Sequence, residues 1–108
     1  MVLTRDFKET VQARARRDAG FRKALLREAV DCMLAGDVET GKIVLRDYIN
    51  ATVGFDKLAG VTHKSPKSLM RMLGPSGNPQ ANNLFEIVAY LQKNEGFRLT
   101  TKAARRQG

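Results

Sequence analysis

Apolar residues recur along this chain at the spacing of helix turns, in segments separated by glycine, proline and small polar residues. The segment 20–35 has one apolar stripe along a helix face, with Leu26 beside it. The stripe consists of Phe21, Leu25, Ala29, Cys32 and Met33. Gly36 should end this helix, and Asp37 is a suitable N-cap for the next. In 38–52, a second face is formed by Val38, Gly41, Leu45, Tyr48, Ile49 and Thr52, while Ile43 and Val44 lie off it. These patterns predict two amphipathic helices.

The second half of the chain is divided more finely. A short helix is expected at 55–60, and another follows the cap-and-proline pair Ser65-Pro66 until Gly74-Pro75. GPSGNP at 74–79 is a loop, and a last helix is expected at about 81–94, with Leu84, Ile87, Val88 and Leu91 on one stripe.

The two ends of the chain give weaker patterns. Residues 5–17 are typical of a very basic helix whose large apolar residues are Phe7 and Val11, and 97–100 alternates as a short strand would. The fold class is therefore all-α, a compact bundle of about five to six helices with an optional short C-terminal strand. The expected division is a basic N-terminal helix or arm at 1–19, a domain at 20–100 and a basic flexible tail at 101–108.

Length and composition narrow the class of protein. A chain of 108 residues has room for one domain, and no apolar run approaches the roughly 18 residues that span a bilayer. The first ten residues lack the apolar core of a secretory signal, and a single cysteine, Cys32, fits a reducing compartment. We therefore expect a cytoplasmic protein without membrane contact.

The net charge indicates a polyanionic partner. Nineteen Lys and Arg against eleven Asp and Glu give +8, and in cytoplasm the abundant polyanion is nucleic acid. The basic residues gather in three groups, at 14–27, at 57–71 and at 102–106. A soluble protein that is merely basic is the alternative on charge alone.

The middle basic group lies in two short helices joined by a tight turn, which describes a helix-turn-helix. Leu58 should anchor the first helix in the core, and Ala59 should be small because the second helix crosses close above it. The turn needs a residue that tolerates positive φ, and that position falls to His63. In the second helix, the residues expected to face inward are Leu69, Met72 and Leu73.

The other face of the second helix has side chains suited to DNA. Lys67 and Arg71 lie four residues apart, with Ser68 and Met70 on their flanks. Arg and Lys pair with guanine O6 and N7 in the major groove, and Ser serves several bases. Ser65 and the N–H groups at the helix start could hold a phosphate. With Lys64 in the turn, the candidate DNA-binding residues are Lys64, Ser65, Lys67, Ser68, Met70 and Arg71. A solvated helix face is the equally weighted alternative for Lys67 and Arg71.

The stretch LAGVTHKSPKSLMRMLGPSGNP at 58–79 resembles the helix-turn-helix of Cro/repressor-type (XRE) regulators, in the variant found in HigA-like addiction-module antidote proteins. The matching positions are Leu58, Ala59, Ser65, Ser68, Leu69, Arg71, Leu73, Gly77, Asn78 and Pro79. The resemblance covers about 21–99, including a Gly-Asp turn at 36–37 and the closing pair Phe97 and Leu99. Three positions depart from that pattern, with His63 for a glycine, Lys64 for an aliphatic residue and Met70 for an aromatic one.

This resemblance implies a lambda-repressor-like core of five helices that binds its operator DNA as a homodimer and often represses its own gene. In the antidote subfamily it also implies a small cognate toxin protein as partner. The dimer contact could come from Ile43 and Val44, or from the segment 97–99. Repressor-like modules also serve regulators that guard no toxin.

Other functions have less support. We expect no enzyme and no cofactor, because His63 and Cys32 fall in different elements and no phosphate-binding glycine loop occurs. No cluster of residues has the spacing of a metal site. An RNA-binding protein would share the charge, but Phe21, Tyr48 and Phe85 are expected to be buried rather than to stack on bases. A protein-interaction module is a further alternative. The basic segment 5–23 could bind a partner protein or could contact DNA phosphates as a disordered leader.

Overall fold

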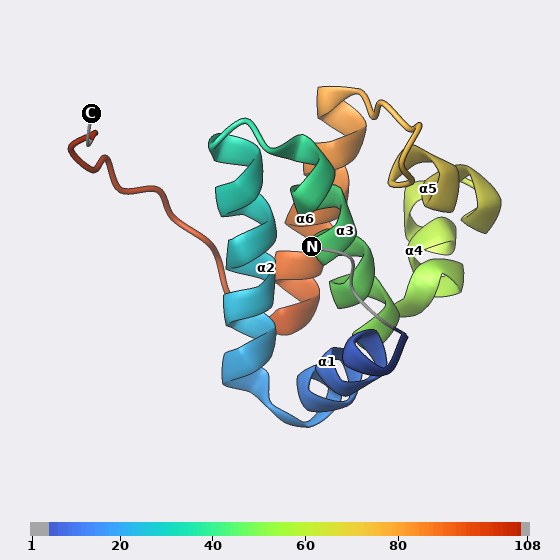
Figure 1. Ribbon diagram of the computed structural model, residues 1–108. Coiled ribbons are helices and arrows are strands. Elements are labelled where there is room, and N and C mark those ends of the chain that lie inside the picture. Colours follow the sequence, from blue (N-terminus) through green and yellow to red (C-terminus); the bar gives the residue numbers. More distant parts are fainter. Residues whose placement is uncertain (1–4, 107–108) are drawn as a thin grey trace.

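Six helices make up most of the computed structural model, which describes residues 5–106 and side chains from Thr10 to Arg106 (Figure 1). They are α1 (Arg5–Arg17), α2 (Ala19–Leu34), α3 (Val38–Ala51), α4 (Gly54–Thr62), α5 (Pro66–Met72) and α6 (Ala81–Glu95). The predicted all-α class is confirmed. The side chain of Phe7 and the outer ends of 1–19 and 101–108 lie outside the described residues.

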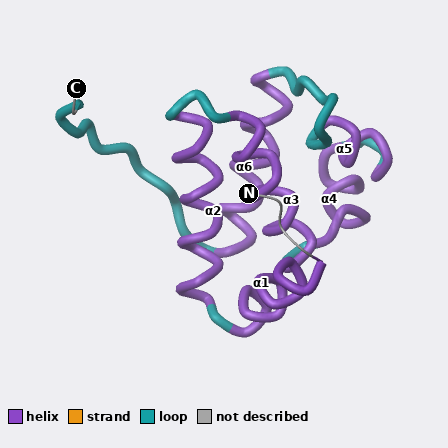
Figure 2. Tube along the Cα trace, in the orientation of Figure 1, coloured by secondary structure: helices purple, strands orange, loops and turns teal. Residues whose placement is uncertain are grey.

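The optional strand at 97–100 is not formed, and within the described residues all regular structure is helical (Figure 2). The N–H of Phe97 donates to the Gln92 carbonyl at 3.1 Å, and the N–H of Leu99 donates to Gln92 Oε1 at 2.6 Å. Both side chains pack against the core. The alternation of apolar and polar residues at 97–100 therefore comes from two inward-facing residues in a loop that folds back on α6. Among the described residues, no second strand lies beside this loop to pair with it.

Helix ends follow the expected chemistry. The side chain of Asp37 accepts a hydrogen bond from the Thr40 N–H at 3.2 Å and caps α3. Gly36 and Gly96 both have positive φ, and they follow the ends of α2 and α6. Asp18, which precedes α2, accepts from the Phe21 N–H in the same way. Local sequence thus determines most of the helix boundaries.

The core lies where α2, α3, α4, α5 and α6 meet. Its buried members are Leu26, Ala29, Leu45, Tyr48, Ile49, Phe55, Leu58, Ala59, Leu69, Leu73, Ile87 and Leu91. Leu69 and Leu73 place one face of α5 in this core, with Met72 packed at its edge. The prediction that Phe85 is buried is wrong: it is 62% exposed, because it projects from α6 away from Ile87 and Leu91.

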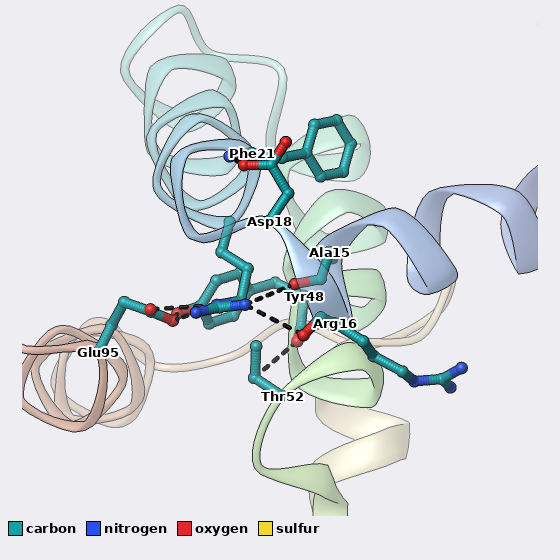
Figure 3. A network of polar contacts seen from close by, with 8 residues as sticks. Ala15, Arg16, Asp18, Phe21, Tyr48, Thr52 and Glu95 are labelled. Carbon is teal, nitrogen blue, oxygen red and sulfur yellow. Dashed lines mark hydrogen bonds and ion pairs between the residues drawn. The ribbon is translucent and has the colours of Figure 1, made fainter.

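A polar network joins α1, α2, α3 and α6 at one end of the bundle (Figure 3). The Arg22 Nε donates to both carboxylate oxygens of Glu95, at 3.0 and 3.1 Å, and the Tyr48 hydroxyl donates to the same carboxylate at 2.9 Å. Another nitrogen of Arg22 donates to the carbonyls of Ala15 and Arg16, at 2.9 and 3.3 Å. We call Arg22, Tyr48 and Glu95 the Arg22 cluster.

The Arg22 cluster explains how the basic helix α1 is held, although it has few apolar residues. Arg22 binds carbonyls at the C-terminal end of α1, where the helix dipole favours a cation. Ala15 is fully buried, and Arg14 lies over the Phe21 ring at 4.6 Å. The helix therefore packs on α2 and α3 through a few specific contacts.

In the described part of the chain, no helix is both long enough and apolar enough to cross a membrane.

Candidate nucleic-acid interface

The turn between α4 and α5 has the backbone conformation that the sequence predicts. His63 has φ 58° and ψ 34°, the left-handed region, and is the one non-glycine residue with positive φ among those described. The N–H groups of His63 and Lys64 both donate to the Ala59 carbonyl, which closes the end of α4. Ala59 is buried as a member of the core. Three residues therefore connect the end of α4 at Thr62 to the start of α5 at Pro66.

The start of α5 is a complete N-cap. The Ser65 Oγ accepts from the Ser68 N–H at 3.1 Å, and Pro66 occupies the first helical position, as predicted. The Leu69 N–H donates to the Ser65 carbonyl. Because Pro66 has no N–H, the Lys67 amide is the one in this turn that the cap does not use. Fewer free N–H donors are therefore available to a phosphate here than the sequence suggested.

The six candidate residues lie together on and beside α5, on the side away from the core. Lys67, Met70 and Arg71 are exposed, Ser65 is exposed at the cap, and Lys64 and Ser68 are half-buried. Neither the Lys67 ammonium nor the Arg71 guanidinium forms a hydrogen bond or an ion pair with another described residue. With Leu69 and Leu73 buried behind them, the helix presents a basic outer face and an apolar inner face.

A hollow beside α5 adds residues that the sequence analysis did not select. Ser68 and Arg71 line it from the helix, and Asn78, Gln80 and Asn83 line it from the following loop and the start of α6. Side-chain amides both donate and accept hydrogen bonds, as base edges and phosphates require. The available signal is the amide-rich stretch 78–83, of which the sequence analysis considers only 78–79, as part of a loop.

Of the three basic groups, the middle one belongs to α4 and α5. The C-terminal tail, with Lys102, Arg105 and Arg106, leaves the bundle beside α2, on the opposite side of the molecule from α4 and α5 (Figure 1). Arg22, in the first group, is bound within the Arg22 cluster. A single copy therefore does not present all of its positive charge on one surface.

Metal ligation and thiol chemistry have little support in the described residues. They contain no group of three or more His, Cys, Asp or Glu side chains that could hold a metal ion. The Cys32 thiol lies 3.6 Å from a Glu28 carboxylate oxygen, and burial followed by that hydrogen bond raises its pKa. A raised pKa disfavours the reactive thiolate.

Comparison of the chain with protein families, with curated proteins and with solved structures finds no match.

Proposed function

We propose that this protein is a sequence-specific double-stranded DNA-binding regulator of transcription that inserts α5 into the major groove. The observation that carries the proposal is α5 itself, with an apolar inner face and a basic outer face. It follows a short turn in which His63 is left-handed, and its Lys67 and Arg71 have no hydrogen-bond or ion-pair partner among the described residues. An Arg or Lys on such a helix reads guanine, and Ser68 can serve several bases. The amides of Asn78, Gln80 and Asn83 are near enough to Arg71 to contact adjacent bases or phosphates.

The proposal includes a homodimer on DNA. A helix of seven residues covers only a few base pairs, and two-fold regulators obtain specificity from half-sites about 34 Å apart. Of the predicted interface residues, Ile43 is exposed, whereas Val44, Phe97 and Leu99 pack against the core. Ile43 is therefore the better placed of these residues for a contact between copies.

The test is a fluorescence-anisotropy titration with the duplex upstream of the protein's own gene, a scrambled duplex and a single-stranded RNA. Arg71→Ala should weaken operator binding by about 1–3 kcal/mol and relax the preference at one base position, with folding nearly intact. Leu69→Ala should do the reverse, costing about 2–5 kcal/mol of unfolding free energy through lost transfer energy and a cavity. Titrations at two salt concentrations should show a logarithmic slope of about 0.9 per neutralised phosphate.

Two results would contradict the proposal. One is wild-type protein that binds operator and scrambled duplex alike, and the other is Arg71→Ala that binds the operator as tightly as wild type. Preference for the RNA would favour the alternative of an RNA-binding protein, for which the exposed ring of Phe85 is an available stacking surface.

A further inference from the structure

Lys42 in α3 is a lysine whose charge is buried. Its side chain is 2% exposed, and its ammonium lies 2.9 Å from the Gly74 carbonyl, 2.7 Å from the Gly77 carbonyl and 2.9 Å from Glu39 Oε1. An ammonium has three N–H donors, so every donor has a partner here. Two of these partners are backbone oxygens of the loop that follows α5. We call Lys42, Gly74 and Gly77 the Lys42 anchor.

The Lys42 anchor lies at the C-terminal end of α5. The Gly74 N–H donates to the Arg71 carbonyl at 3.1 Å, and the Gly77 N–H donates to the Gly74 carbonyl at 3.0 Å. A Cβ at Gly77 would overlap the carbonyl oxygens of Arg71 and Met72, so the loop is pressed directly against the helix end. A buried cation at this end also interacts favourably with the helix dipole.

Such an anchor matters because α5 is short. Seven residues make two turns, which have little helical stability of their own, so the direction of α5 depends on what it packs against. Leu69 and Leu73 fix its inner face in the core, and the cap at Ser65 fixes its start. Lys42 fixes its end, one turn from the exposed guanidinium of Arg71.

We propose that Lys42 is a positioning residue for DNA recognition: it holds the end of α5 and the 74–79 loop at the orientation in which Arg71 and the loop amides can reach the bases. This inference rests on the proposed DNA-binding function. Lys42 does not itself contact DNA, because its ammonium is enclosed by the protein. Its contribution should therefore appear in discrimination between sequences and not in general affinity for DNA.

The experiment compares operator and scrambled duplex for wild type and three variants. Lys42→Met removes the ammonium and keeps a long apolar side chain. Gly77→Ala forces the loop away from α5 with Lys42 and α3 unchanged. Lys93→Met, in the exposed last turn of α6, removes the same charge without touching the anchor. Circular dichroism melts identify a temperature at which every variant is folded, and binding is measured there. Hydrogen exchange is followed at the backbone amides of Leu73, Gly74 and Gly77.

We expect Lys42→Met and Gly77→Ala each to lower the operator-to-scrambled affinity ratio by about tenfold or more, which is the effect of losing one good base contact. Affinity for the scrambled duplex should change no more than it does in Lys93→Met, and exchange should accelerate at Gly74 and Gly77. The double variant should lose little beyond either single change, because both act on one contact. If Lys42→Met does not fold, Gly77→Ala carries the test.

Three outcomes overturn the inference. The first is that folded Lys42→Met or Gly77→Ala has the same operator-to-scrambled affinity ratio as wild type. The second is that these variants lose affinity equally for both duplexes. Either leaves the proposed function standing, provided that wild type discriminates. The third is wild-type protein that does not discriminate, which removes the proposed function and this inference together.

Discussion

Arg22 and Arg71 carry the same side chain in opposite settings. The guanidinium of Arg22 donates to Glu95 and to two carbonyls of α1, and its side chain is 21% exposed. The guanidinium of Arg71 is exposed and has no partner among the described residues. The first arginine joins α2 to α1 and α6, whereas the second is available to an external ligand.

This difference shows why the net charge of +8 is a poor measure of the charge that nucleic acid would meet. Lys42 and Arg22 are bound internally, and the basic tail lies across the molecule from α5. What distinguishes α5 is a pair of basic side chains, Lys67 and Arg71, that lie four residues apart on a packed helix and have no partner in the described part of the chain. The predictions below test whether the two arginines divide stability and binding in this way.

The largest expected effect is on stability. Arg22→Ala removes two hydrogen bonds from the Glu95 carboxylate, which is 10% exposed and keeps the hydrogen bond from the Tyr48 hydroxyl. It also releases the end of α1. We expect a loss of about 2–3 kcal/mol of unfolding free energy in a denaturant melt, somewhat below the value for fully buried pairs because Arg22 keeps some solvent contact. Operator affinity measured on folded protein should change far less than it does in Arg71→Ala.

Arg17→Ala is the matched control for this prediction, since Arg17 is an exposed arginine of the same basic group at 14–27. It should shift the unfolding free energy by no more than about 0.5 kcal/mol. Equal stability of the Arg22 and Arg17 variants would show that the Arg22 cluster adds nothing to the fold.

A smaller effect is expected on the pH dependence of stability. Burial alone would raise the pKa of Glu95, but hydrogen bonds from Arg22 and Tyr48 outweigh it, and the pKa lies below its ordinary value. The cluster therefore stabilises the fold fully above the unfolded-state pKa of about 4.3, and this contribution is lost as the pH falls through the lower folded-state value. Glu95→Gln should flatten the acid limb of a plot of unfolding free energy against pH.

Asp18 and Asp37 also have lowered pKa values, from hydrogen bonds at their helix caps, so part of the acid limb should persist in Glu95→Gln. Asp37→Asn gives the comparison for a cap. If the acid limb is as steep in Glu95→Gln as in wild type, the fold does not favour the ionised form of Glu95 over the protonated form.

These residues also show what the sequence could and could not predict. The turn at His63, the cap at Ser65 and the inward pair Leu69 and Leu73 followed from local rules about φ, capping and helical period. The burial of Lys42 and Arg22 did not, because it depends on partners that lie 32 or more positions away, at Gly74 and Glu95. A lysine on an amphipathic helix is also normally solvated. Phe85 was misplaced because helical period identifies an apolar stripe but not where its edge meets solvent.

The smallest expected effect concerns the turn that connects the two helices of the candidate interface. His63 has the left-handed conformation, and its side chain is exposed. The Cβ of an L residue destabilises that conformation by about 1 kcal/mol, and glycine has no such penalty. Glycine also adds freedom to the unfolded chain, which costs about 0.4–1 kcal/mol. His63→Gly should therefore be neutral or stabilising by less than about 1 kcal/mol in a denaturant melt. His63→Ala keeps the Cβ and removes the imidazole, so it separates backbone strain from any contact of the ring. If the glycine variant is clearly less stable than the alanine variant, the Cβ at this position does not destabilise the turn, and the prediction fails.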